Sequence, residues 1–166
     1  LAVYHRLLDT FGHSIRLAVQ SYLYRTPADV QRIIEHGGSI RLVKGAYKEP
    51  PEIAYQGKKE INQASIRVMG QFFSPQAKAN KAFLVLGSHD PELIEWLTRE
   101  APAHGLSQAD FEFQMLLGIR RDEQQRLADQ GYRMRVYVPY GSAWYPYFMR
   151  RLAERPANLL FFLRNL

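Results

Sequence analysis

Five short β-rich runs, each set apart by a helical pattern, constrain the fold more than any other feature. The runs are IRLAVQSYL (15–23), SIRLVKGAY (39–47), KAFLVLGSH (81–89), DFEFQMLLG (110–118) and MRVYVPYG (134–141). The helical patterns are YHRLLDTF, ADVQRIIEHG, KKEINQASIRVMGQFF, ELIEWLTREA, RRDEQQRLADQG and AWYPYFMRRLAER. Strands that alternate with helices favour crossover connections and a parallel sheet. No linker or break in composition divides the 166 residues, so we expect a single domain.

Two helix starts carry the same signal. Thr26 followed by Pro27 predicts an N-cap and a proline in the first turn, and Gly37 predicts the end of that helix. Asp90 and Pro91 repeat the pattern before the fourth helix.

The chain is basic, with a net charge of +6 and a pI near 9.6. This charge favours anionic partners such as phosphates, carboxylates, nucleic acid or acidic lipid, although scattered Lys and Arg also suit a solvated basic surface. The absence of cysteine excludes disulfides, thiol chemistry and Cys-ligated metals, and no metal site is predicted. With no signal peptide and no apolar run of about 18 residues, a cytoplasmic protein is expected.

Two α/β architectures use five such units: a doubly wound sheet, or part of a (βα)8 barrel, which needs about 250 residues. Both bind ligands at the carboxyl ends of the strands. A doubly wound sheet concentrates its site at one Gly-rich turn, and no G-x-G-x-x-G follows any strand here. Instead, all five runs end in polar or small residues: Gln20, Lys44 to Tyr47, Ser88 with His89, Gln114, and Tyr137. Polar or small residues at all five strand ends favour a TIM-like barrel.

The second run carries two charges, Arg41 and Lys44. Buried charges cost several kcal/mol unless they are paired, so this strand needs partners. Alternation places Arg41, Val43 and Gly45 on the face opposite Leu42. If Leu42 faces the helices, Arg41 faces the barrel interior and should meet an acid, an electron-rich heterocycle or a phosphate. A structural ion pair in the barrel core is the alternative.

Five motifs, RLVKGAY, SHDPELI, FEFQMLLG, RVYVPYG and RRLAERPANLLFFLR, together resemble the carboxyl-terminal half of proline dehydrogenase, a flavoenzyme with a (βα)8 barrel. The match runs from about Val19 onward in the family's order and spacing. The resemblance implies oxidation of L-proline to Δ1-pyrroline-5-carboxylate, with hydride passing from C5 to N5 of FAD and electrons going to a quinone. Residues 1–166 would then form roughly the last five βα units of one barrel domain.

The resemblance also assigns the cofactor residues. Arg41 matches the catalytic arginine beside flavin N5, whose fixed charge stabilises the reduced flavin. Gln20 matches a glutamine that hydrogen-bonds the flavin ring. The segment near the phosphates and ribityl chain comprises Val43, Lys44, Gly45 and Ala46.

Ser88 and His89 match a hydroxyl–histidine pair near the pyrophosphate, with serine where threonine is common. For His89 alone, capping of the next helix is the alternative. Lys48 stands where some members stack a tryptophan on the adenine, so that stacking is not expected here.

On the substrate side, Arg150 and Arg151 match paired arginines that bind the proline carboxylate, and Glu154 is spaced to form ion pairs with them. An exposed basic helix face is the alternative. Residues expected to pack on the pyrrolidine ring are Tyr47, Leu116 and Tyr137, for which core packing is the alternative. Since relatives that oxidise 4-hydroxyproline carry a smaller residue at the position of Tyr137, this tyrosine favours proline.

The family's first three strands, with a lysine and an aspartate of the site, have no match here, so we expect a longer chain or a partner fragment that supplies the missing amino-terminal half. Two other classes stay open. A flavodoxin-like electron carrier predicts acidic loops around the ring. A basic module for nucleic acid or acidic lipid predicts Lys and Arg on one surface, whereas here they lie at strand ends and across helices, which disfavours nucleic acid.

The apolar segment NLLFFLRNL at residues 158–166 also has two interpretations. We favour a helix that closes the barrel over one that docks peripherally on the inner face of a bacterial membrane, where a quinone resides.

Overall fold

In a computed structural model, which describes residues 1–142, 145 and 149, five strands form one parallel sheet. The strands are β1 (Leu17–Gln20), β2 (Ser39–Val43), β3 (Phe83–Gly87), β4 (Phe111–Leu116) and β5 (Arg133–Tyr137). Their spatial order is β1-β2-β3-β4-β5, and every neighbouring pair is parallel. A flavodoxin-like sheet would have the order 2-1-3-4-5. The predicted parallel α/β class is confirmed.

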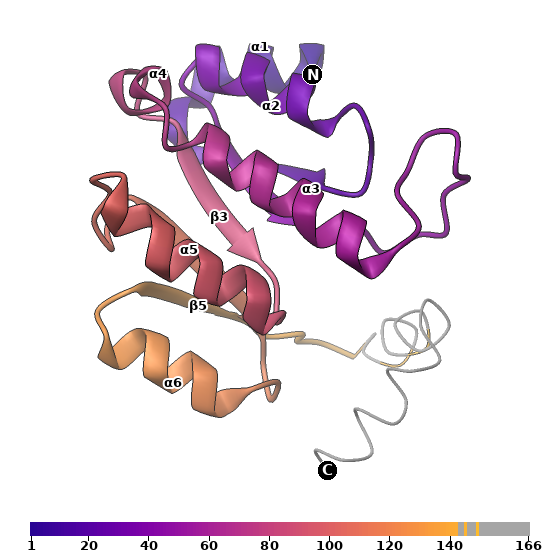
Figure 1. The fold of residues 1–166 in the computed structure, drawn as a ribbon, viewed down its shortest axis with the longest axis vertical. Helices are drawn as coiled ribbons and strands as arrows, with labels where there is room; N and C mark the ends of the chain where they lie inside the picture. The colour runs from indigo at the N-terminus through magenta and orange to yellow at the C-terminus, as the bar shows by residue number, and fades with distance from the viewer. Residues whose placement is uncertain (143–144, 146–148, 150–166) are drawn as a thin grey trace.

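The helices cover one face of this sheet. They are α1 (Ala2–Phe11), α2 (Thr26–Glu35), α3 (Lys58–Gln71), α4 (Pro75–Ala79), α5 (Pro91–Ala103) and α6 (Arg121–Asp129), with a 3-10 turn at Gly12–Ser14. Figure 1 shows α3, α5 and α6 in front of the strands, with β3 and β5 running behind them. A doubly wound sheet would carry helices on both faces, so this arrangement is of the barrel type. In the part of the chain just defined, no helix is long and apolar enough to cross a membrane.

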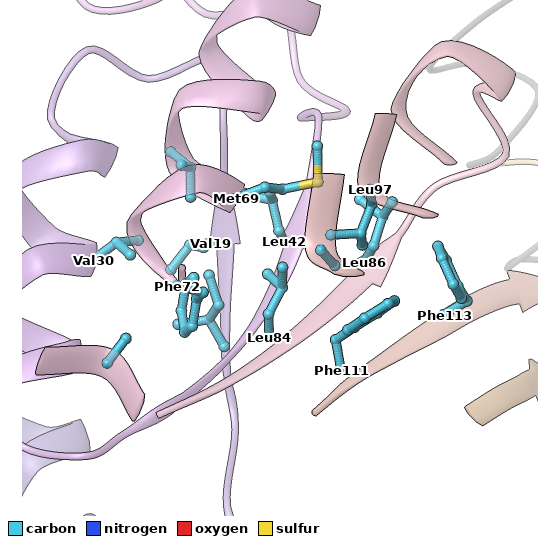
Figure 2. Packing of buried hydrophobic residues seen from close by; sticks show 14 of the residues in the cluster. Val19, Val30, Leu42, Met69, Phe72, Leu84, Leu86, Leu97, Phe111 and Phe113 are labelled. Atoms are coloured by element: carbon cyan, nitrogen blue, oxygen red, sulfur yellow. The ribbon is translucent and has the colours of Figure 1, made fainter. Parts of the chain in front are cut away.

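The hydrophobic core lies between the helices and one face of the sheet. Alternate strand residues point into it, among them Leu42 on β2, Leu84 and Leu86 on β3, and Phe113 on β4. Met69 of α3 and Leu97 of α5 are buried in the same cluster (Figure 2). Each such side chain contributes about 1.5–3 kcal/mol when fully buried. The core therefore fixes which strand residues point the other way.

The opposite face of the sheet carries charged and amide side chains among small and apolar ones. Because side chains alternate along a strand and register partners share a face, Arg41 lies on the same face as Ala18 and Val85. One step further along the strands, Val43 is aligned with Gln20. The remaining residues of this face on β3, β4 and β5 are Phe83, Gly87, Glu112, Gln114, Leu116, Arg133, Arg135 and Tyr137. We call this set the polar face; it is the face that a closed barrel turns inward.

Several local predictions need correction. Each strand is shorter than its β-rich run, because residues at one or both ends of the run lie outside the strand. Thr26 is not an N-cap: α2 begins there, Arg25 is its N-cap, and the Thr26 hydroxyl donates to the Gln20 carbonyl at 2.6 Å. The Asp90 cap is confirmed, since its carboxylate accepts from the Glu92 N–H at 3.0 Å. Of the helix predicted over 143–155, only Tyr145 and Met149 are among the described residues, and both are helical.

One helix has no counterpart among the predictions. Ser74 caps α4 by accepting from the Ala77 N–H at 3.2 Å, and Pro75 occupies its first turn. The Ser-Pro pair is the same start signal that marks α5, and it could have identified this helix.

Candidate active site

Arg41 lies on the polar face with an unsatisfied donor. Its Nε is buried and has no hydrogen-bond partner, and across residues 1–142 its guanidinium forms no ion pair. A buried donor without an acceptor costs about 1–3 kcal/mol. The alternative of a structural ion pair in the barrel core therefore finds no support in this part of the chain. An acceptor for Arg41 Nε would therefore have to come from outside these residues.

The loop after β2 continues the pairing with β1. The Ser21 N–H donates to the Val43 carbonyl at 2.8 Å, and the Tyr22 N–H donates to the Lys44 carbonyl at 3.0 Å. Gly45 then has a φ of 120°, and a Cβ there would lie 2.5 Å from the Tyr22 ring. Only glycine allows this conformation and this approach. The segment Lys44 to Ala46 is thus held against the end of β1, beside Gln20.

Lys44 is fixed by an ion pair with Asp90. Asn62 of α3 also donates to Asp90, at 3.4 Å, and to Glu92 at 2.5 Å. Burial of the Asp90 carboxyl raises its pKa, but the hydrogen bond and charge of Lys44, with the other donors, outweigh burial and leave the pKa lowered. The carboxylate therefore joins the end of β2 to the start of α5.

Ser88 and His89 lie at the end of β3. The Ser88 hydroxyl accepts from the Asp90 N–H at 3.1 Å. His89 Nε2 accepts from the Leu116 N–H at 2.9 Å, an arrangement that assigns the ring proton to Nδ1. Burial lowers the pKa of His89, and the charge of Arg120 lowers it further. His89 is thus a neutral imidazole; the cap of α5 is Asp90.

Three of the predicted substrate-side residues lie at the same edge of the sheet. Leu116 is the register partner of Tyr137, and the Leu117 N–H donates to the Tyr137 carbonyl at 3.0 Å. Tyr47 is 61% exposed and Tyr137 48% exposed, so neither is a core residue. Leu116 is partly buried. The carboxyl ends of β2, β3, β4 and β5 therefore gather the predicted groups, whereas Arg150, Arg151 and Glu154 lie outside the described residues.

The sequence reading missed an ionic network on the polar face. Glu112 of β4 is buried and accepts from Arg135 at 2.8 and 3.1 Å and from Gln114 at 2.7 Å. Burial raises the pKa of Glu112, but hydrogen bonds from Arg135 and Gln114 outweigh burial, and the pKa is lowered. Period-two alternation along FEFQMLL places Glu112 and Gln114 opposite the core residues Phe111 and Phe113. That signal could have placed Glu112 and Gln114 on the polar face, although it does not reveal their pairing with Arg135.

The family model described as proline dehydrogenase matches residues 1–164. This chain belongs to the proline dehydrogenase family. A proline dehydrogenase of Deinococcus radiodurans is 41% identical over 167 residues, which cover 100% of this chain and 52% of that protein. Proline dehydrogenase 1 of Bacillus subtilis strain 168 is 38% identical over 169 residues, covering 100% and 53%. The chain spans about half the length of the curated relatives it matches.

Solved structures share the fold. A crystal structure of proline utilization A from Bdellovibrio bacteriovorus, inactivated by N-propargylglycine, superimposes with a TM-score of 0.75 at 24% identity, over 85% of this chain and 16% of that one. A proline utilization A mutant from Bradyrhizobium japonicum gives a TM-score of 0.68 at 21% identity, over 84% and 16%. The predicted TIM-barrel type of fold is confirmed.

Proposed function

We propose that this chain forms the carboxyl-terminal part of one (βα)8 barrel domain that oxidises L-proline to Δ1-pyrroline-5-carboxylate with FAD as cofactor. Family membership supports the reaction, and the share of each relative that is matched supports an amino-terminal half outside these residues. That half would pair with the open edges of β1 and β5. The polar face would then be the interior of the closed barrel.

The observation that carries the proposal is the buried, unpartnered Nε of Arg41. An electron-rich ring atom such as flavin N5 would accept the hydrogen bond for which the described residues offer no acceptor. When bound, FAD would take the hydride from C5 of proline and pass the electrons to a quinone. Arg41 would hold a fixed positive charge beside the flavin ring, which becomes anionic on reduction, and preorganised electrostatic stabilisation of this kind is usually the largest single contribution to catalysis.

Other residues would hold the cofactor. Gln20 offers an amide to the ring from the end of β1. The anionic phosphates and the ribityl chain would lie along Val43, Lys44, Gly45, Ala46, Ser88 and His89. Lys44 has three donor hydrogens, so its ion pair with Asp90 leaves hydrogens for a phosphate oxygen. His89, with its proton on Nδ1, can donate one further hydrogen bond.

The substrate would bind above the carboxyl ends of β4 and β5. Arg150 and Arg151, held by Glu154, would take its carboxylate. Tyr47, Leu116 and Tyr137 would contact the pyrrolidine ring. The partial exposure of Tyr137 supports a ring contact more than a packing role, and its bulk would disfavour a 4-hydroxyl substituent.

The runner-up functions are less well supported. A flavodoxin-like carrier is disfavoured by the strand order and because the helices among the described residues cover the same face of the sheet. A basic binding module gives no reason for the buried Arg41 donor.

An absorption spectrum of the purified complete protein tests the proposal. We expect flavin bands that L-proline bleaches under anaerobic conditions, while pyrrolidine, which lacks the carboxylate, bleaches them far more slowly. Flavin that L-proline leaves oxidised would support an electron carrier instead. A protein without flavin would refute the cofactor and the reaction together.

A further inference from the structure

Gly87 ends β3 on the polar face, where the backbone does not require glycine. Its φ does not lie among the positive values, which belong to glycines such as Gly45 and Gly118. Glycine in a strand loses conformational entropy on folding and offers no side chain for packing, so it often marks a place where something must approach closely. The reason for Gly87 must therefore be space.

That space is beside Arg41. A Cβ at position 87 would lie 3.2 Å from Arg41 Nε and 3.1 Å from Val43 Cγ1. Both separations are tighter than ordinary van der Waals contact, so an added methyl would push the Arg41 side chain. The nitrogen that would be displaced is the same one that is buried without a partner. Two independent features, an unneeded glycine and an unsatisfied donor, thus meet at one point.

We propose that Gly87 is a positioning residue for Arg41: the missing side chain leaves room for Arg41 Nε beside the end of β3, where it would act on the cofactor. This inference rests on the proposed function, because it concerns how strongly Arg41 acts on flavin N5. Gly87 itself has no charge and no side chain with which to bind the cofactor. Its effect passes entirely through the place that the guanidinium occupies.

A structural reading also exists, and the test must separate the two. The same Cβ would lie 3.3 Å from the Leu42 carbonyl oxygen, so Gly87 could serve only to let β3 approach β2. A substitution would then lower stability without changing how the flavin responds to charge. The readout must therefore report charge at N5.

Sulfite provides that readout. It adds to N5 of oxidised flavin to give an anionic adduct, so its dissociation constant reports the neighbouring positive charge without turnover. In the flavin-loaded complete enzyme, Gly87→Ala should weaken sulfite binding about three- to tenfold. Gly87→Val should weaken it about a hundredfold, near the loss expected when one preorganised contact is removed. Gly70→Ala is the matched control, since Gly70 lies on α3 and a Cβ there meets nothing within 4 Å; its sulfite affinity should equal that of the wild type.

A double-mutant cycle shows whether Gly87 affects sulfite binding through Arg41. In an Arg41→Met background, Gly87→Ala should cause no further loss of sulfite affinity. An equal loss in both backgrounds would mean that residue 87 acts on the flavin directly, and would overturn the proposal. So would a Gly87→Ala enzyme that binds sulfite as Gly70→Ala does, or one that loses flavin whether or not Arg41 is present. A wild-type protein that holds no flavin, or whose flavin ignores L-proline, would instead refute the proposed function.

Discussion

Arg135 on β5 forms a bidentate ion pair with Glu112 on β4. Arg135 Nε donates to Glu112 Oε1 at 2.8 Å, and Nη2 donates to Oε2 at 3.1 Å. The two partners differ in burial: the Glu112 side chain is 5% exposed and that of Arg135 is 62% exposed. The carboxylate therefore depends on the pair more than the arginine does. This asymmetry gives the first prediction.

Arg135→Met should destabilise the protein by about 2 kcal/mol, because it leaves a buried carboxylate without its main partner. Glu112→Gln should cost less, about 1 kcal/mol, since its amide oxygen still accepts a hydrogen bond from Arg135 and no carboxylate is left buried without a partner. Because the folded pKa of Glu112 is lowered, the stabilisation exists above the ordinary value of 4.5 and is lost as the pH falls through the folded pKa. Urea unfolding at neutral and acid pH measures both effects. Equal losses for the two variants, or a difference that does not shrink in acid, would contradict this account of the pair.

Asp90 combines a helix cap and an ion pair, which two substitutions can separate. Asp90→Asn should keep the cap on α5 and lose the charge that holds Lys44, whereas Asp90→Ala should lose both and cost about 1 kcal/mol more. The lowered pKa of Asp90 means that its ionic contribution is present above the ordinary value of 3.8 and disappears as the pH falls through the folded pKa. Chemical denaturation of both variants, with Lys44→Met as the matched partner, checks this. If Asp90→Asn lowers the free energy of unfolding as much as Asp90→Ala does, the cap contributes nothing measurable to stability.

Arg150 and Arg151 are predicted to bind the substrate carboxylate and not to contribute to binding of the cofactor. Since each charge-assisted hydrogen bond contributes about 1.5–3 kcal/mol, changing either arginine to methionine should lower kcat/KM for proline by roughly one to two orders of magnitude. The double variant should lose less than the sum, because both donors serve one carboxylate. Steady-state kinetics and flavin content test the assignment. Variants that shed flavin but still bind a tetrahydrofuran carboxylic acid normally would move the arginines to the cofactor site.

Much of the fold follows from local sequence patterns. The alternation of apolar residues in SIRLV predicted that Leu42 would face the helices and Arg41 the other face, and the core confirms this for Leu42. The Asp90-Pro91 pair predicted the start of α5. Polar residues at every strand end pointed to a barrel, and the one-sided layer of helices agrees.

What was missed depends on pairing across strands. Glu112 and Arg135 are 23 positions apart, and their pairing requires the register of β4 and β5. The sequence indicates only that Gly87 lies near the end of a strand, and its closeness to Arg41 Nε is known only from the structure. The Thr-Pro pair predicts a cap at Thr26, but the Thr26 hydroxyl instead donates to the Gln20 carbonyl at the end of β1, and Arg25 is the N-cap of α2.

The most direct test of the central claim is the rate at which L-proline reduces the flavin of the Arg41→Met enzyme under anaerobic conditions. If Arg41 is the charge that stabilises the reduced flavin, the variant should keep its flavin, show a lower flavin potential and be reduced about a hundredfold more slowly, as expected for the loss of roughly 3 kcal/mol of preorganised stabilisation. A reduction rate and a flavin potential equal to those of the wild type would contradict the assignment of Arg41.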